Sequence, residues 1–167
     1  MFARFGALLT QRCEIARRLF QRVDLRVDTK PDRSLVTEAD REIESAARKL
    51  VAERRPELGV YGEEQGEQAG SSGARLIIDP IDSTSNFVRG IPVFATLLAI
   101  EVEREVVAGL VSAPALGTRW HAARGQGAWQ GERRLRVSGV RELEHAQLFH
   151  GSLGGYEGGR TPPGLLE

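Results

Sequence analysis

Asp79 and Asp82 lie three residues apart, after the apolar run RLII and before the hydroxyl cluster STS. Pro80, between them, has no backbone N–H and holds the preceding residue in extended backbone, so we expect the chain to leave a strand here. Two carboxylates that converge on one point repel each other unless a cation or a proton lies between them. Oxygen ligands with no His or Cys nearby favour Mg²⁺ over zinc. The segment therefore predicts a magnesium site at the end of a strand.

The hydroxyl cluster that follows is typical of a helix start. The free N–H groups of a helix that begins at Ser83 and Thr84 can bind phosphate. A divalent metal beside a bound phosphate is the arrangement used in metal-assisted phosphoryl transfer. Taken alone, however, a D-P-x-D segment more often has a structural role, in which Asp82 caps the helix and Asp79 is a turn residue.

A second acidic segment, YGEE, shifts the balance toward a metal site. Glu63 and Glu64 follow the predicted strand that precedes RLIID, and by themselves they would indicate a solvated loop. If the two strands are neighbours, Glu63 can share a metal with Asp79. The third segment, KPDRSLVTEAD, fits a functional role for Asp40 and a helix-capping box completed by Asp40 about equally well.

Two helices followed by a run of strands must position these residues. Apolar side chains recur at helical spacing over residues 2–23, and Thr37 begins a second helix that Pro56 ends. Residues 64–74, rich in Gly, Ser and Gln, predict a flexible loop. The order predicts an α+β fold in which the two helices pack on one face of a largely antiparallel sheet, with no later helix to cover the other face. The strand candidates are 58–64, 75–79, 94–103, 106–114 and 118–123, followed by a hairpin over 125–137.

The overall composition limits the classes of partner and compartment. Lys and Arg number 23 and Asp and Glu number 23, so no net charge favours nucleic acid or an anionic membrane as a partner. Cys13 is the single cysteine, which excludes an intrachain disulfide and predicts a cytoplasmic protein. The segment MFARFGALLT lacks the features of a signal peptide, and the apolar run IPVFATLLAI is about half the length that a membrane span needs.

The three acidic segments together carry a family resemblance. KPDRSLVTEAD, YGEE and IIDPIDSTSNFVRG, in this order and spacing, resemble the inositol monophosphatase family of Mg²⁺-dependent, lithium-sensitive phosphatases. AARGQGAWQGERRLRVS is similar to the hairpin and strand that follow the family's metal motif, and the resemblance extends over about residues 5–155. DLRVDTKPD, NFVRGIPVFATLLA and GLVSAPALGTRWHAARGQGAW look closest to the branch that dephosphorylates histidinol phosphate in histidine biosynthesis.

The resemblance implies a ligand set for two magnesium ions. Glu63, Asp79 and the backbone carbonyl of Ile81 would hold the first Mg²⁺. Asp79 and Asp82 would bridge toward a second.

The resemblance also implies which groups act on water and on the phosphate. Thr84 would orient the attacking water with Glu63 as its carboxylate partner, and Asp40 would hydrogen-bond Thr84. The N–H groups of Ser83 and Thr84 would hold the phosphate. We therefore expect Glu63, Thr84 and Asp40 to be the catalytic residues in hydrolysis by a metal-activated water.

The function implied by the resemblance is a Mg²⁺-dependent phosphomonoesterase that acts on histidinol phosphate as a cytoplasmic homodimer. Two alternatives stay open. One is an inositol-1-monophosphatase or another sugar-phosphate phosphatase, and the other is a non-catalytic remnant that binds Mg²⁺ or phosphate.

One departure from the family pattern lies inside the metal motif. The family motif reads D-P-x-D-G-T, and Ser83 stands in place of its glycine. If this position requires a positive φ, serine costs roughly 1 kcal/mol or more; if it does not, serine is tolerated.

A second departure concerns the end of the chain. The family's Trp-Asp motif, whose aspartate completes the second metal site, has no counterpart, because Trp120 and Trp129 are followed by His and Gln. We expect residues 1–155 to form the N-terminal αβ domain, the first half of the layered αβαβα sugar-phosphatase fold. A Gly- and Pro-rich tail over 156–167 would follow, with the family's C-terminal domain absent and the chain weakly active or inactive.

Overall fold

The computed structural model describes residues 13–147 and residue 149. The chain forms two compact units, Met1–Leu135 and Arg136–Glu167. The described residues of the second unit include one short 3₁₀ helix, η2 (Leu143–His145). The predicted start of the first helix and the predicted tail over 156–167 lie outside the described residues.

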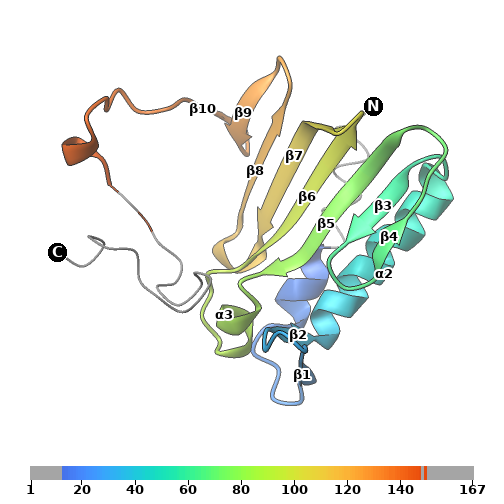
Figure 1. The fold of residues 1–167 in the computed structure, drawn as a ribbon. Helices are drawn as coiled ribbons and strands as arrows, with labels where there is room; N and C mark the ends of the chain where they lie inside the picture. The colour runs from blue at the N-terminus through green and yellow to red at the C-terminus, as the bar shows by residue number, and fades with distance from the viewer. Residues whose placement is uncertain (1–12, 148, 150–167) are drawn as a thin grey trace. The chain divides into compact units, whose positions relative to one another are not determined.

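The first unit is built on an eight-stranded sheet with the order β10-β9-β8-β7-β6-β5-β3-β4 (Figure 1). Neighbouring strands are antiparallel except for β3 and β5, which are parallel. The predicted largely antiparallel α+β fold is therefore confirmed. The strands are β3 (Gly59–Gly62), β4 (Gly66–Gln68), β5 (Ala74–Asp82), β6 (Ala95–Val102), β7 (Glu105–Ala113), β8 (Thr118–Ala123), β9 (Gly127–Gln130) and β10 (Arg133–Leu135), with the 3₁₀ helix η1 (Pro114–Leu116) between β7 and β8.

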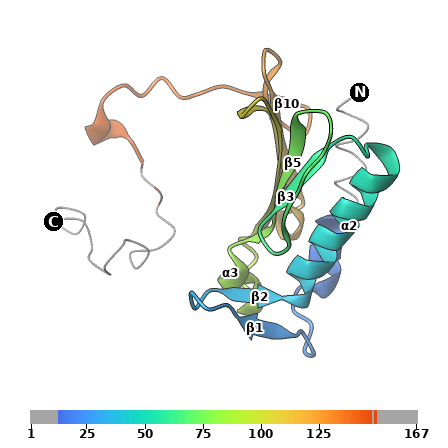
Figure 2. The same cartoon turned by 45° about the vertical axis from the view of Figure 1, so that its right-hand side comes forward.

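Two helices pack on one face of this sheet, as Figure 2 shows. They are the first helix, described over 13–19, and α2 (Glu38–Arg54). Strand side chains alternate between the two faces, so Leu76 and Ile78 of β5 are buried beneath the helices. Among the described residues of the first unit, no helix covers the opposite face. The core cluster contains Cys13, Ala16, Leu19, Ala39, Ile43, Ala47, Leu50, Val51, Leu58, Val60, Leu76, Ile78, Ile81, Phe87, Phe94, Leu98 and Ile100.

The start of α2 follows the predicted capping pattern. Thr37 is the N-cap residue; its hydroxyl accepts hydrogen bonds from the backbone N–H groups of Ala39 and Asp40, while the Asp40 carboxylate accepts the Thr37 N–H. The helix ends at Arg54, two residues before Pro56. Both predicted ends of this helix are confirmed.

A separate two-stranded hairpin lies beside the start of α2. Its strands are β1 (Val27–Thr29) and β2 (Leu35–Thr37), which pair antiparallel. Its turn is closed by hydrogen bonds from the Lys30 N–H to the Ser34 carbonyl and from the Arg33 N–H to the Lys30 carbonyl. The Asp32 carboxylate also accepts from the N–H and hydroxyl of Ser34. The hairpin thus places the side chain of Lys30 at a fixed point.

Two sequence expectations are wrong in detail. The predicted loop over 64–74 contains a strand, β4, which pairs antiparallel with β3. The chain also does not leave the sheet at Pro80, because β5 continues to Asp82, which pairs with Ala95 after a register shift. Pro80 sits inside this irregularity, where its missing N–H breaks no ladder bond, and its carbonyl accepts a hydrogen bond from the Thr96 hydroxyl at 2.8 Å.

The short helix α3 (Thr84–Val88) is held to the core by an aromatic cluster. The Phe87 side chain is 1% exposed, and its ring centroid lies 5.6 Å from that of Phe20 and 4.9 Å from that of Phe94. This anchor fixes the chain that follows the two motif aspartates.

We expect Phe87→Ala to lower the free energy of unfolding by about 3–5 kcal/mol, because it removes a buried ring and leaves a cavity. Val93→Ala is the control; this side chain is 57% exposed and its loss should stay within about 0.5 kcal/mol. Urea denaturation measures both. A Phe87→Ala loss no larger than the control would show that α3 is anchored by other contacts.

Candidate functional site

The parallel pairing of β3 with β5 brings Glu63 and Asp79 together. Gly62 is paired with Ile78, and the Glu63 N–H donates to the Ile78 carbonyl at 3.2 Å. The next residue in each segment is an acid: Glu63 directly follows β3, and Asp79 lies within β5, which continues to Asp82. Because the two strands run in the same direction, the two acids lie beside each other. The two carboxyl groups are close enough for the negative charge of Glu63 to raise the pKa of Asp79. The two strands are therefore neighbours, as the sharing of a metal by Glu63 and Asp79 requires; the sharing itself stays a prediction.

Asp79 is the most perturbed acid of the cluster. Burial, and then the negative charges of Glu63 and Asp82, raise the pKa of Asp79 from 3.8 to about 7. Its Oδ1 atom is buried and has no hydrogen-bond partner among the described residues. An unpartnered buried carboxylate oxygen beside two other acids is a position where a cation is stabilised.

Lys30 supplies the positive charge that the structure places on this cluster. Its Nζ donates to Glu63 Oε1 at 2.8 Å and to Glu64 Oε1 at 2.7 Å. Burial lowers the pKa of Lys30, but the two carboxylates outweigh it and raise the pKa above its usual value. Burial also raises the pKa of Glu64, against the opposing effect of Lys30.

The residues after Asp79 form a tight connection into α3. Ile81 is buried, and its carbonyl accepts a hydrogen bond from the Thr84 hydroxyl at 3.0 Å. Ser83 has φ 69° and ψ 48°, in the left-handed region, and its side chain makes no capping hydrogen bond. Asp82 is exposed at the end of β5.

Asp40 has a different partner from the expected one. Its carboxylate is 1% exposed, and Oδ2 accepts from the N–H of Thr37 at 2.8 Å and from the Thr37 hydroxyl at 2.6 Å. The hydrogen bond expected between Asp40 and Thr84 is thus replaced by two local ones, because the capping box places Thr37 three residues away on the same helix. Burial raises the pKa of Asp40, and the charge of Glu63 adds to the rise.

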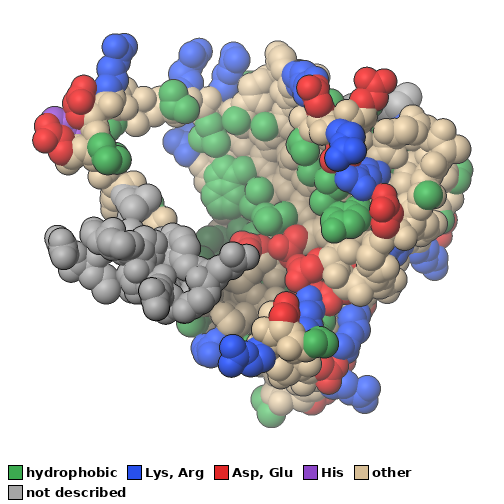
Figure 3. Space-filling model, viewed as in Figure 1, with side chains coloured by type: hydrophobic (Ala, Val, Ile, Leu, Met, Phe, Trp, Pro, Cys, Tyr) green, Lys and Arg blue, Asp and Glu red, His purple; other side chains and the backbone are tan. Residues whose placement is uncertain are grey.

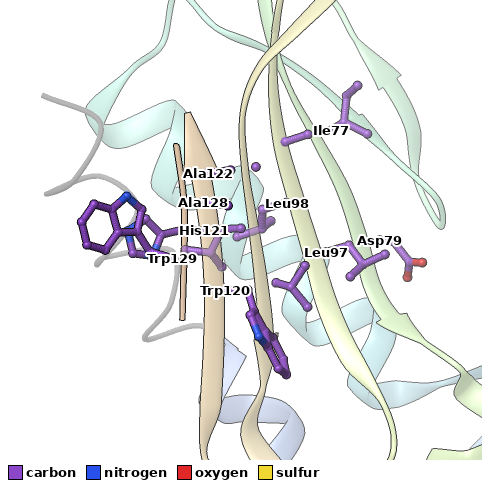
Figure 4. A pocket seen from close by; sticks show the side chains of 13 residues that line it. Ile77, Asp79, Leu97, Leu98, Trp120, His121, Ala122, Ala128 and Trp129 are labelled. Atoms are coloured by element: carbon purple, nitrogen blue, oxygen red, sulfur yellow. The ribbon is translucent and has the colours of Figure 1, made fainter. Parts of the chain in front are cut away.

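The acids lie beside an apolar surface on the sheet face opposite α2. Figure 3 shows acidic side chains gathered next to hydrophobic ones. A cavity of about 440 Å³ opens on this face, lined by residues of β5 to β9. In Figure 4, Asp79 lies at one side of the cavity and Trp129 at the other, with Leu97 and Trp120 between them. An acidic site thus borders an apolar hollow.

The donor set fits a hard divalent cation. Among residues 13–147 and 149, no three His, Cys, Asp or Glu side chains are already arranged to hold a metal ion. The unpartnered oxygen of Asp79 and its raised pKa nevertheless indicate a place for a cation. The all-oxygen donors favour Mg²⁺ over zinc.

A family model described as the inositol monophosphatase family matches residues 2–161. The chain belongs to this family. It is 48% identical over 166 residues to a histidinol-phosphatase of Mycobacterium tuberculosis, which covers 96% of this chain and 62% of the relative. It is 40% identical over 130 residues to an inositol-1-monophosphatase of Rhizobium meliloti, which covers 77% of this chain and 49% of the relative.

A solved structure shows the same fold. The extragenic suppressor protein suhB of Bartonella henselae superposes with a TM-score of 0.80 at 34% identity, over 84% of this chain and 56% of that protein. The chain therefore spans about half to three fifths of the lengths of the relatives that it matches.

Two residues that contact the acidic cluster or the turn that carries it were missed in the sequence. Lys30 is part of KPDRSLVTEAD, but only the tertiary contact between its hairpin and the turn after β3 shows its role. Glu44 contacts the same turn from α2. Its signal in the sequence was an acid on the apolar stripe of a helix, where a charge needs a buried partner.

The backbone at Ser83 predicts a stabilising substitution. A left-handed conformation is strained for any residue with a Cβ, so Ser83→Gly should raise the free energy of unfolding by about 1 kcal/mol. Ser85→Gly makes the same chemical change one residue into α3 and should destabilise slightly, because glycine disfavours helix. Paired urea titrations measure the difference. Equal effects of the two substitutions would contradict the strain at position 83.

The raised pKa of Asp79 predicts a pH dependence of stability without metal. Because the folded pKa of about 7 is above the usual 3.8, stability from this group is full below about pH 4 and is lost as pH rises through about 7. Asp79→Asn should flatten the curve over this window. Unfolding in EDTA at several pH values tests this, with the exposed Asp28→Asn as the control, and an Asp79→Asn curve as steep as the wild type's would refute the assignment.

Proposed function

We propose that the protein is a Mg²⁺-dependent phosphomonoesterase whose substrate is histidinol phosphate. The observation that carries the proposal is that Glu63 and Asp79 lie beside each other on the neighbouring strands β3 and β5, with a buried oxygen of Asp79 that has no hydrogen-bond partner among the described residues. Relatives from Mycobacterium tuberculosis and Streptomyces coelicolor, both named histidinol-phosphatase, are 48% and 45% identical to the chain and support the substrate.

Magnesium would supply positive charge to activate water and to offset the charge of the phosphate. Glu63, Asp79, the carbonyl of Ile81 and Asp82 are the groups that would hold it. A related inositol monophosphatase of Staphylococcus is described as a LiCl-soaked inhibitory complex, at 25% identity and a TM-score of 0.74, which supports a cation-dependent site.

The remaining site residues would act on the reactants. Glu63 and Thr84 would orient the attacking water, and the N–H groups of Ser83 and Thr84 would hold the phosphate. Asp40 would act indirectly, because its hydrogen bonds to Thr37 fix the start of α2 beside the acids. Lys30 would limit the repulsion between Glu63 and Glu64 when the metal is absent.

Cellular context and assembly are part of the same proposal. We expect a cytoplasmic homodimer. In the part of the chain that the structure describes, no helix is long and apolar enough to cross a membrane.

A second candidate is a chain that binds Mg²⁺ or phosphate without turnover. The observation that favours it is that Lys30 Nζ already donates to Glu63 Oε1 at 2.8 Å, the carboxylate that would act on the attacking water. An active, stable chain contradicts this candidate, and Mg²⁺ binding without phosphate release from any phosphomonoester supports it.

Phosphate release tests the proposed function. The full chain should release phosphate from histidinol phosphate in Mg²⁺ and prefer this substrate to inositol-1-phosphate. Asp79→Asn should lower kcat/KM at least 10- to 100-fold, because it removes a charged metal ligand, whereas the exposed Asp28→Asn should have no effect. A folded wild-type chain that releases no phosphate from either substrate would overturn the proposal.

A further inference from the structure

A buried carboxylate on α2 binds the turn that carries the site acids. The Glu44 side chain is fully buried, with 0% exposure. Its Oε2 accepts the N–H of Glu64 at 2.8 Å, and its Oε1 accepts the N–H of Gln65 at 3.1 Å. Two successive backbone N–H groups of the turn therefore donate to a single side chain, which lies on α2, twenty residues earlier in the sequence than Glu64.

Arg48, one helical turn after Glu44, completes the contact. Its Nε and Nη2 donate to Glu44 Oε1 at 2.9 and 2.7 Å, and Nη2 also donates to the carbonyl of Gly66 at 2.6 Å. The Arg48 side chain is 12% exposed, so this is a nearly buried ion pair. Together, Glu44 and Arg48 bind the turn between β3 and β4 at Glu64, Gln65 and Gly66. The charge of Glu44 is balanced by Arg48, so Glu44 is not expected to bind a metal ion.

Gly62 shows how closely the carboxylate approaches the turn. A Cβ added at Gly62 would overlap the Glu44 carboxyl group. The φ of Gly62 is not in the positive region, so the glycine is required here by the close approach and not by its backbone conformation.

These contacts enclose Glu63 on both sides. Its own N–H is held by the Ile78 carbonyl of β5, and the next N–H in the chain is held by Glu44. With the peptide groups before and after it fixed, the Glu63 side chain is directed to Asp79 on the face away from α2. Without the hydrogen bonds from Glu64 and Gln65 to Glu44, the turn and Glu63 would be free to move with the exposed strand β4.

We infer that Glu44 is a positioning residue that aligns Glu63 for the shared cation with Asp79. The inference rests on the proposed function, because it concerns the Mg²⁺ site proposed above. Glu44 itself does not touch the cation; it acts through the backbone of Glu64 and Gln65.

Glu44→Gln is the decisive variant, because an amide keeps the size but offers one acceptor where four donors converge. We expect the Mg²⁺ dissociation constant, measured by calorimetry with Mg²⁺ alone, to rise about 10- to 100-fold. Amide exchange measured by NMR at Glu64 and Gln65 should also accelerate. Glu42→Gln makes the same change on the exposed side of α2, where the side chain is 46% exposed, and should leave both readouts unchanged.

Gly62→Ala is the second variant, in case Glu44→Gln does not fold. It keeps every ligand and the Glu44 charge but displaces the carboxylate from the turn, so it should weaken Mg²⁺ binding in the same way. The wild type and both variants are compared at equal folded fraction, with the free energy of unfolding measured in parallel.

The outcomes separate the inference from the proposed function. Wild-type protein that binds Mg²⁺ while a folded Glu44→Gln or Gly62→Ala variant binds it equally well overturns the inference alone. Wild-type protein that binds no Mg²⁺ overturns the proposed function and the inference with it. Weakened binding together with faster exchange at Glu64 and Gln65 supports the positioning role.

Discussion

The parallel pairing of β3 and β5 is the constraint on which the site depends. Its register places Gly62 opposite Ile78, so Glu63, just after β3, and Asp79, still within β5, must lie side by side. Like charges at this range repel, and burial of Asp79 increases the cost of ionising both. The sheet tolerates the repulsion because the ladder is held by backbone hydrogen bonds and by the apolar core beneath it. The fold therefore stabilises an arrangement that the two side chains alone would not adopt.

The surrounding charges are divided between two separate tasks. Lys30 forms ion pairs with Glu63 and Glu64 and thus offsets the negative charge of these two residues. Arg48 is committed to Glu44, so this buried pair fixes the turn without adding net charge to the site. Neither cation is paired with Asp79, whose Oδ1 has no partner among the described residues. The negative charge that no basic side chain offsets is thus concentrated at Asp79, and an added cation is stabilised most there.

Local patterns predicted much of this architecture, whereas tertiary contacts decided the rest. The capping box at Thr37 and the helix end before Pro56 follow from short-range rules. The position of Glu63 directly after β3 does so too. The continuation of β5 past Pro80 does not, because it needs Thr96 on the neighbouring strand to bind the Pro80 carbonyl. The roles of Lys30 and Glu44 likewise depend on contacts between segments that are 20 to 34 residues apart in the chain. A sequence pattern names a charged residue but not the partner that neutralises it.

The strain at Ser83 is a consequence of the same geometry. Asp82 is still paired in the sheet and Thr84 already begins α3, so one residue must change the chain direction, and it does so at φ 69°. The residues on both sides cannot relax to relieve it. Thr84 is tied to the Ile81 carbonyl, and Phe87 donates its N–H to the Ser83 carbonyl while its ring is locked among aromatic neighbours. Strain of this kind persists only where the surrounding contacts over-determine the backbone, and here those contacts are the ones that set the position of Asp82 relative to Asp79.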